Sequence, residues 1–204
     1  MDQTTILIVD DHAVLRMGLA SLLNSQKDLK VVADAENADE ALSKAARLHP
    51  SVVVMDLLIP GRNGIEITRD LVAADPDVKV LVLTSYSTSS GIAAALEAGA
   101  KGAILKSAPF EDITYAIREV AAGREFVSAE IQRVLEEDPP LKSLTPRQLS
   151  VLRLLARGLS NPDISKALGI REDVVKDHVI AILQRLDAAN RTEAVSTAFR
   201  HHLI

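Results

Sequence analysis

The chain has 204 residues, 48% of them apolar, and its 23 Lys and Arg against 28 Asp and Glu give a net charge of −5 at neutral pH. It contains no cysteine, which excludes disulfides and thiolate metal sites, and no apolar run approaches the length that crosses a membrane. Because the N-terminus lacks a signal-like segment, we expect a cytoplasmic protein with no membrane partner.

The charge is unevenly distributed along the chain. Residues 143–204 carry 9 basic and 6 acidic residues, a net charge of +3, whereas the preceding residues carry 14 and 22, a net charge of −8. An acidic first part and a mildly basic last part predict two domains with different partners.

Short apolar strands alternate with helical patterns over the first 120 or so residues. The predicted strands are 6–9, 31–33, 52–55, 80–84 and 103–106. The run before Asp56 is apolar at successive positions, which is typical of a strand buried on both faces of a parallel sheet. Five such units predict an α/β, doubly wound, five-stranded parallel sheet.

Polar residues stand at the ends of four of these strands. They are Asp10, Asp11, Asp56, Thr84 and Lys106. Each has a structural alternative, such as helix capping by Asp11, a strand-end role for Thr84 or a solvated side chain for Lys106. Right-handed crossovers, however, bring all the strand ends to one edge of the sheet, where ligands bind in such folds.

Phosphoryl transfer to a carboxylate requires this combination of groups. Three clustered carboxylates repel one another unless a divalent cation lies among them, and Mg²⁺ prefers oxygen ligands. Thr84 can then hydrogen-bond one phosphoryl oxygen and Lys106 can neutralise another, which leaves Asp56 as the nucleophile.

Residues 4–122 resemble the receiver domains of bacterial two-component response regulators, which have a flavodoxin-like fold. The matching residues are Asp10-Asp11, Met55-Asp56, Ile59-Pro60-Gly61, Gly64, Leu83-Thr84-Ser85, Ala98-Gly99-Ala100 and Leu105-Lys106. The resemblance implies that Asp56 is the phosphoacceptor and that Asp10, Asp11, Asp56 and the carbonyl of Leu58 hold Mg²⁺.

One position departs from the family pattern. Family members usually carry an aromatic residue three positions before the conserved lysine, and here that position is Ala103. Without this switch residue, we expect activation to depend on the loop after the fourth predicted strand, residues 84–91, with Tyr86 as the relay.

The last part of the chain has a different pattern. A short helix around Ile164, a turn containing Gly169 and a longer helix with apolar residues at 175, 179, 182 and 186 form a helix-turn-helix pattern. We therefore expect a receiver domain over 1–122, a linker over 123–142 and a smaller all-α domain over 143–204.

This all-α segment resembles the DNA-binding domain of NarL/LuxR-type regulators. The matching residues are Leu144-Thr145-Pro146-Arg147, Val151-Leu152, Leu159-Ser160-Asn161, Ile164, Leu168-Gly169-Ile170, Val175-Lys176, His178-Val179, Ile182-Leu183, Leu186 and Asn190-Arg191-Thr192-Glu193-Ala194. His178 is expected to pack beside the recognition helix rather than to bind a metal.

The recognition helix is unusually acidic for a surface that faces DNA. Its candidate DNA-contacting residues are Arg171, Lys176, Asp177, Gln184 and Arg185. Asp177 can accept a hydrogen bond from a cytosine amino group, it can repel phosphate, or it can lie just clear of DNA. The candidate dimer contacts, in the last helix, are Val195, Ala198 and Phe199.

The sequence as a whole predicts a transcriptional response regulator. A sensor histidine kinase would phosphorylate Asp56, and the phosphorylated chain would form a homodimer that binds promoter DNA. Its only enzymatic chemistry would be its own phosphorylation and dephosphorylation. The alternative is a regulator that acts mainly through protein contacts.

Two enzyme classes fit less well. An aspartyl-phosphate phosphatase usually has a second Asp two residues after the nucleophile, where this chain has Leu58. A flavin binder would need a phosphate-binding loop after the first strand, where Asp10 and Asp11 would repel a phosphate.

Overall fold

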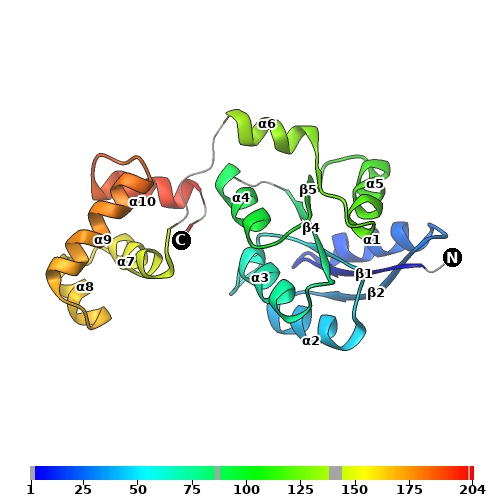
Figure 1. Cartoon of the computed structure of the whole chain (residues 1–204), viewed down its shortest axis with the longest axis horizontal. Coiled ribbons are helices and arrows are strands. Elements are labelled where there is room, and N and C mark those ends of the chain that lie inside the picture. The colour runs from blue at the N-terminus through cyan, green and yellow to red at the C-terminus, as the bar shows by residue number, and fades with distance from the viewer. Residues whose placement is uncertain (1–2, 86–87, 138–143, 202) are drawn as a thin grey trace. The chain divides into compact units, whose positions relative to one another are not determined.

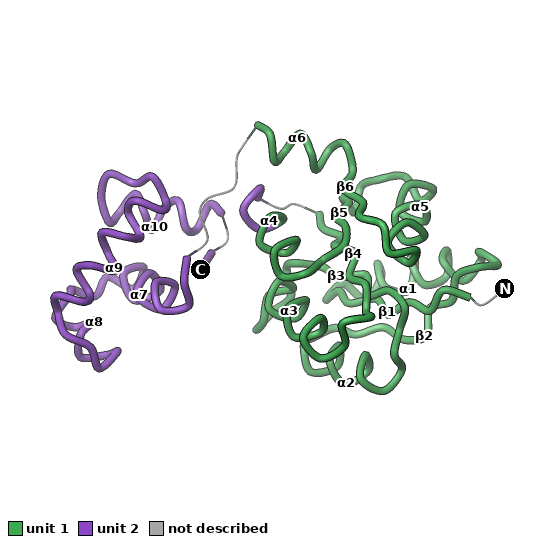
Figure 2. The backbone as a smooth tube through the Cα atoms, in the orientation of Figure 1, with its two compact units in different colours: residues 1–87, 92–137 green, residues 88–91, 138–204 purple. Residues whose placement is uncertain are grey.

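The structure is a computed structural model that describes residues 3–85, 88–137, 144–201 and 203–204. The chain divides into two compact units, residues 1–87 with 92–137 and residues 88–91 with 138–204 (Figure 2). In the parts that the structure describes, no helix is both long and apolar enough to cross a membrane.

The first unit is a parallel sheet flanked by helices (Figure 1). Its strands are β1 (Thr4–Val9), β2 (Leu29–Ala35), β3 (Val52–Met55), β4 (Lys79–Thr84), β5 (Gly102–Leu105) and β6 (Phe126–Val127), in the order β2-β1-β3-β4-β5-β6. Its helices are α1 (Ala13–Asn24), α2 (Ala38–Leu48), α3 (Gly64–Ala74), α4 (Ser89–Glu97) from residue 92 onward, α5 (Phe110–Ala121) and α6 (Ala129–Glu137).

The sheet separates two hydrophobic cores. One core contains buried residues of α1 and α5, including Leu19, Leu23 and Ile117. The other contains buried residues of α2, α3, α4 and α6, including Ile67 and Ile131. Since both faces are covered, the central strands contain continuous apolar runs, and every residue of β3 is apolar and buried.

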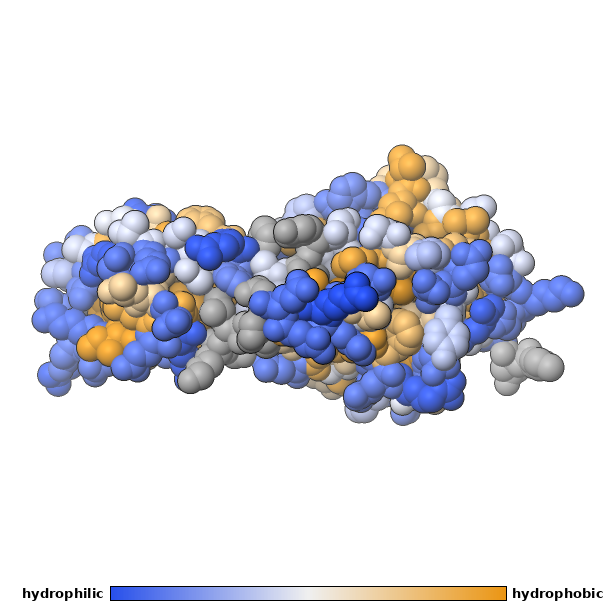
Figure 3. Space-filling view, turned by 90° about the horizontal axis from the view of Figure 1, so that it is seen from above, coloured by the Kyte–Doolittle hydropathy of each residue, from blue (hydrophilic) through white to orange (hydrophobic). Residues whose placement is uncertain are grey.

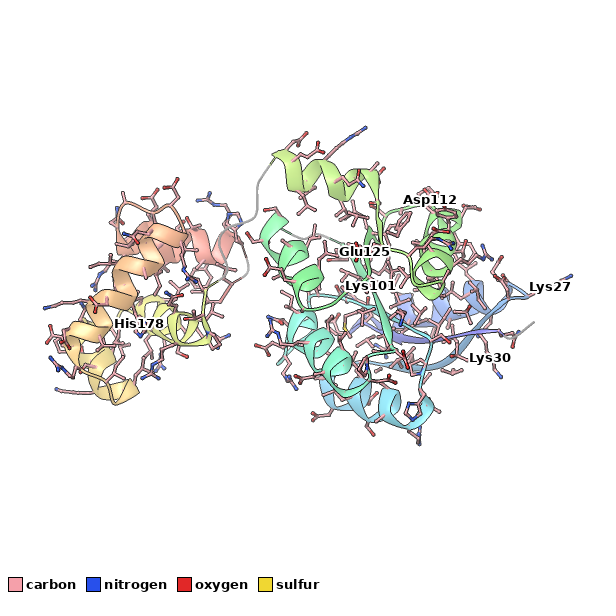
Figure 4. All side chains as sticks on the ribbon, viewed as in Figure 1. Lys27, Lys30, Lys101, Asp112, Glu125 and His178 are labelled. Carbon is pink, nitrogen blue, oxygen red and sulfur yellow. The ribbon has the colours of Figure 1, made fainter. Side chains whose placement is uncertain are left out.

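A sixth strand extends the predicted five-stranded sheet. β6 pairs in parallel with β5, placing Phe126 opposite Gly102. Lys101 and Glu125, which precede these two strands, point toward one another and form an ion pair at 3.4 Å (Figure 4). A strand of two residues is too short to show a periodic pattern, so the sequence did not reveal it.

The sixth strand also changes the extent of the first unit. Ile131 of α6 is fully buried in the core that α2, α3 and α4 share. Residues 126–137, assigned to a linker from the sequence, are therefore part of the first unit.

The second unit is a helical bundle of α7 (Pro146–Ala156), α8 (Asn161–Leu168), α9 (Glu172–Arg185) and α10 (Arg191–Arg200). Thr145 caps α7 in a capping box with Gln148, as the Thr-Pro start predicts. Gly169 ends α8 in the left-handed conformation, with φ at 63°. The bundle core includes the predicted apolar residues of α9, Val175, Val179 and Ile182.

Candidate functional site

The strand ends of the first unit bring the predicted polar residues to one edge. Asp10 follows β1, Asp56 follows β3, Thr84 ends β4 and Lys106 follows β5. The main chain fixes them there, because the Asp56 N–H donates to the Val9 carbonyl at 2.8 Å and the Lys106 N–H donates to the Thr84 carbonyl at 2.8 Å. The chain order reverses beside β1 and β3, which is where open α/β sheets bind ligands.

Lys106 joins two of the carboxylates. Its ammonium lies 2.5 Å from Asp10 Oδ2 and 2.7 Å from Asp56 Oδ2. All three side chains are nearly buried, with 9% of the Lys106 side chain exposed and 4% and 3% of the Asp side chains. Thr84 is fully buried at the same edge. The structure thus brings together groups that are up to 96 positions apart in the sequence.

The acidic side of this edge is open to solvent. One ligand atom from each of Asp10, Asp11, His12 and Asp56 lies within 4.8 Å of the others, and these four residues form the one such cluster in the parts of the chain that the structure describes. Asp11 is exposed, whereas Asp10 and Asp56 are buried. Three carboxylates in this arrangement fit the oxygen donors that Mg²⁺ prefers.

One ammonium, shared between Asp10 and Asp56, does not neutralise the negative charge of both carboxylates. Burial raises the pKa of Asp56, against the lowering effects of the Lys106 hydrogen bond and charge and of the Leu58 N–H. Burial also opposes the charged form of Lys106, but its hydrogen bonds to Asp10 and Asp56 outweigh that cost and raise its pKa. Lys106 is therefore charged at neutral pH, and Asp56 favours a further positive charge nearby.

The loop after Asp56 depends on a close approach of two backbone segments. The Gly64 N–H donates to the Leu57 carbonyl at 3.0 Å, and a Cβ atom added at Gly64 would come within 2.1 Å of the Asp56 carbonyl oxygen. Glycine is thus required sterically, since no side chain fits there. The Leu58 N–H donates to Asp56 Oδ1 at 3.2 Å, which orients the carboxylate.

Sequence reasoning missed two residues of this edge. His12 donates its N–H to Asp10 Oδ1 at 2.8 Å, and its Nδ1 lies 2.7 Å from Asp11 Oδ1. Arg16 is nearly buried and contacts the Asp10 carbonyl. Its position was a usable signal, because Arg16 lies three and seven residues before the buried Leu19 and Leu23, on the same helix face.

The structure describes Ala103, where the usual aromatic switch residue is missing, but not the switch candidate Tyr86. Ala103 is fully buried in β5, opposite Val82 of β4. Tyr86, the candidate for relaying activation, lies outside the described residues.

In the second unit, α9 exposes most of the face predicted to be opposite its apolar residues. Asp173, Asp177, Ile180 and Gln184 are exposed, while Ala181 is half-buried. His178 is half-buried on the same helix and belongs to no metal-type cluster in the described chain (Figure 4).

Most candidate cations near α9 already contact carboxylates. Arg171 pairs with Asp173, with Nη2 at 2.5 Å from Oδ2, and Lys176 lies 3.5 Å from Glu172. Both acids lie in the first turn of α9, where carboxylates are favoured by the helix dipole. Arg185 is half-buried near the end of the helix.

The candidate dimer contacts in α10 differ in exposure. Phe199 is 56% exposed, but Ala198 is fully buried in the bundle core and Val195 is half-buried against it. The prediction that Ala198 contacts a second copy is therefore wrong: its side chain packs inside its own unit.

Two protein-family models match the chain. Residues 6–118 match the response regulator receiver domain, and residues 142–198 match the bacterial regulatory proteins of the luxR family. One match lies in each compact unit.

Similar proteins match over two thirds of the chain or more. The response regulator protein VraR of Staphylococcus aureus is 37% identical over 204 residues, covering 98% of each chain. The crystal structure of ChrA, a response regulator of a heme-sensing two-component system, is 36% identical with full coverage of both chains and a TM-score of 0.59. A LuxR-family response regulator from Aurantimonas sp. is 36% identical over 67% of this chain and 98% of its own, with a TM-score of 0.63.

Proposed function

The chain belongs to the two-component response regulators that join a receiver domain to a LuxR-type DNA-binding domain, and from this premise we propose that Asp56 is its phosphoacceptor. One observation carries the proposal. The Lys106 ammonium bridges Asp56 and Asp10 at the sheet edge, with the carboxylate of Asp11 in the same cluster.

The residues at this edge divide the work of phosphoryl transfer. A carboxylate oxygen of Asp56 attacks the phosphorus of the donor and forms a new P–O bond. The bond from phosphorus to the leaving atom breaks at the same time; this atom is an imidazole nitrogen in a phosphohistidine and an oxygen in acetyl phosphate. Lys106, placed 2.7 Å from Asp56, neutralises one phosphoryl oxygen. The Thr84 hydroxyl, at the end of β4, donates a hydrogen bond to another phosphoryl oxygen.

The carboxylates also fit a magnesium ion. Asp10, Asp11 and Asp56 would hold Mg²⁺ together with the carbonyl of Leu58, and the ion would offset charge on the phosphoryl oxygens. Burial raises the pKa of Asp56 in spite of the nearby Lys106 ammonium, so a further cation would stabilise the charged carboxylate, which supports this assignment.

We propose that a sensor histidine kinase supplies the phosphoryl group and that phosphorylation promotes a homodimer that binds promoter DNA through α9. Phosphorylation is a local change of charge that can shift an equilibrium between two states of the receiver. The proposed boundaries are a receiver that continues through β6 and α6 to Glu137, and a DNA-binding domain from residue 143.

A second function has a specific observation in its favour. The exposed face of α9 carries Asp173 and Asp177, and its Ile180 is 53% exposed. Such a face is less suited to a polyanion than to a protein partner, so a regulator acting through protein contacts is the alternative.

Phosphorylation of Asp56 is tested with the full chain and acetyl phosphate. In Mg²⁺ the intact mass should increase by one phosphoryl group, and Asp56→Asn should abolish the increase. Asp77→Asn is the matched control, because Asp77 is exposed just before β4, at the opposite edge of the sheet. Labelling of the Asp56→Asn variant, or labelling without a divalent metal, would contradict the proposal.

A further inference from the structure

We infer that Arg16 is a positioning residue, which holds the backbone of Asp10 so that its carboxylate faces the metal. This inference rests on the proposed magnesium site. It concerns a side chain that would touch neither the ion nor the phosphoryl group and that acts through Asp10.

Arg16 is an unusual residue for the first turns of a surface helix. Just 10% of its side chain is exposed, although the next two residues of α1, Met17 and Gly18, are exposed. A guanidinium is rarely buried to this degree unless its donors are paired. Its burial therefore indicates a set of specific contacts.

The guanidinium joins three segments of the chain. Its Nη1 donates to the Asp10 carbonyl at 2.6 Å, and its Nε donates to Asp34 Oδ2 at 2.8 Å. Its Nη2 lies 3.6 Å from Glu36 Oε2. Arg16 thus ties the end of β1 to the end of β2 and the loop that follows it.

This contact completes the restraints on Asp10. The Asp10 N–H donates to the Ala35 carbonyl at 3.1 Å, while its carboxylate contacts the His12 N–H and the Lys106 ammonium. Arg16 is the partner that holds the remaining polar atom, the carbonyl oxygen. With the peptide fixed on both sides, the side chain has little freedom to turn away from Asp56.

The charge of Arg16 also has a consequence for this edge. Asp34 and Glu36 add two carboxylates beside a cluster that already contains Asp10, Asp11 and Asp56. Arg16 pairs with both of the added carboxylates. A planar guanidinium can hold a carbonyl and a carboxylate together, whereas an ammonium offers one compact charge.

The test is a Mg²⁺ titration of the unphosphorylated full chain, followed by amide chemical shifts. Groups that orient metal ligands typically contribute a factor of about 10–100 to metal affinity. Arg16→Gln should therefore raise the Mg²⁺ dissociation constant by roughly tenfold or more. Arg16→Lys keeps the positive charge but loses the planar guanidinium that reaches both the Asp10 carbonyl and Asp34. Its Mg²⁺ dissociation constant should therefore lie between those of the Gln variant and the wild type.

Arg118→Gln is the matched control. Arg118 holds Asp28 at 2.7 and 3.0 Å just before β2, at the opposite edge of the sheet, and its loss should leave the Mg²⁺ affinity unchanged. The thermal midpoint of every variant is measured in Mg²⁺-free buffer, because a merely structural role would lower the midpoint without changing the dissociation constant.

The outcomes separate this inference from the proposed site. If the wild type binds Mg²⁺ and Asp11→Asn weakens it, the proposed site stands, and an Arg16→Gln dissociation constant within twofold of wild type overturns the role of Arg16. If Arg16→Gln does not fold, Arg16→Lys decides: weaker binding supports positioning, and wild-type binding overturns it. If Asp11→Asn has no effect or the wild type binds no Mg²⁺, the metal site is wrong and this inference fails with it.

Discussion

Asp56 is a charged group in a place that the fold shields from water. Just 3% of the residue is exposed, and the Lys106 ammonium beside it is shared with Asp10. A buried carboxylate that shares its cation with a second carboxylate destabilises the folded state, since the charged form loses its hydration. The reactive residue therefore reduces the stability of the receiver, and this cost can be measured.

The first prediction concerns the pH dependence of that cost. The pKa of Asp56 is raised in the folded state by burial, so the folded chain binds this proton more tightly than the unfolded chain does. Stability should fall as pH rises through the interval between the unfolded and folded pKa values. Asp56→Asn removes this titrating group. The variant should therefore be as stable as wild type well below this pH interval, and more stable than wild type above it.

The magnitude should be on the order of 1 kcal/mol at pH 7, or about 2–6 °C in the thermal midpoint. Midpoints are measured in Mg²⁺-free buffer at pH 7 and at pH 3, which is below the ordinary Asp pKa of 3.8, with Asp77→Asn as control. Mg²⁺ should reduce the advantage, because the ion stabilises the Asp side chain and not the Asn side chain. An Asn variant less stable than wild type at pH 7 would contradict this account of Asp56.

At the scale of the element, α9 combines a well-packed inner face with an acidic outer face. Val175 and Ile182 are fully buried, so the helix is held in one orientation. Arg171 is paired with Asp173 and Lys176 with Glu172, so cations at the start of the helix are partly neutralised within it. Asp177 is exposed on the outer face of α9. A substitution at this position can therefore show what its charge contributes to DNA binding.

We predict that Asp177→Asn changes DNA binding in one of two distinguishable ways. If Asp177 repels phosphate, the variant should bind specific and unrelated DNA about three- to tenfold more tightly, equivalent to about 1 kcal/mol. If Asp177 accepts from a cytosine amino group, the variant should lose about 1–3 kcal/mol of preference for its site.

The measurement compares the phosphorylated full chain on genomic fragments and on unrelated DNA at fixed salt. Asp187→Asn removes the same charge just after α9 and serves as the control. Unchanged affinity and preference in the Asp177 variant would place this side chain away from DNA. Absence of DNA binding by phosphorylated wild type would favour the protein-contact function.

At the scale of the whole molecule, both units expose large apolar side chains. Figure 3 shows apolar residues among hydrophilic ones on one face of the chain. In the described residues of the second unit, the largest exposed apolar side chains include Ile180 at 53% and Phe199 at 56%. They lie on different helices, α9 and α10, and can therefore serve different partners.

We predict that Phe199→Ser weakens the phosphorylation-dependent dimer. Burying a Phe side chain contributes about 1.5–3 kcal/mol, so the dimer dissociation constant should rise roughly tenfold or more. Ile180→Ser is the matched control, with similar exposure on α9, and should leave the dimer unchanged in the absence of DNA. Sedimentation of phosphorylated chains provides the measurement, and equal dimerisation of the Phe199 variant and wild type would remove α10 from the interface.

The sequence by itself determined the elements that carry strong periodic patterns. Continuous apolar runs identified β1, β3 and β4, because a strand covered on both faces must be apolar at every position. The convergence of Asp10, Asp56, Thr84 and Lys106 followed from the topology, since parallel strands joined by right-handed crossovers all end at one edge. Cap residues likewise marked the start of α7.

The tertiary structure alone decided the features that depend on contacts between distant segments. β6 is a strand only because β5 offers an open edge beside it, and Ile131 is a core residue only because the sheet lies beneath α6. Ala198 was predicted to be a surface contact of α10, but it packs inward because a small residue fits where the helices of the bundle meet. The spacing of Arg16 from Leu19 and Leu23 could have indicated its burial, but its contacts could not be predicted. Its partners, the Asp10 carbonyl, Asp34 and Glu36, come from segments that only the folded sheet brings together.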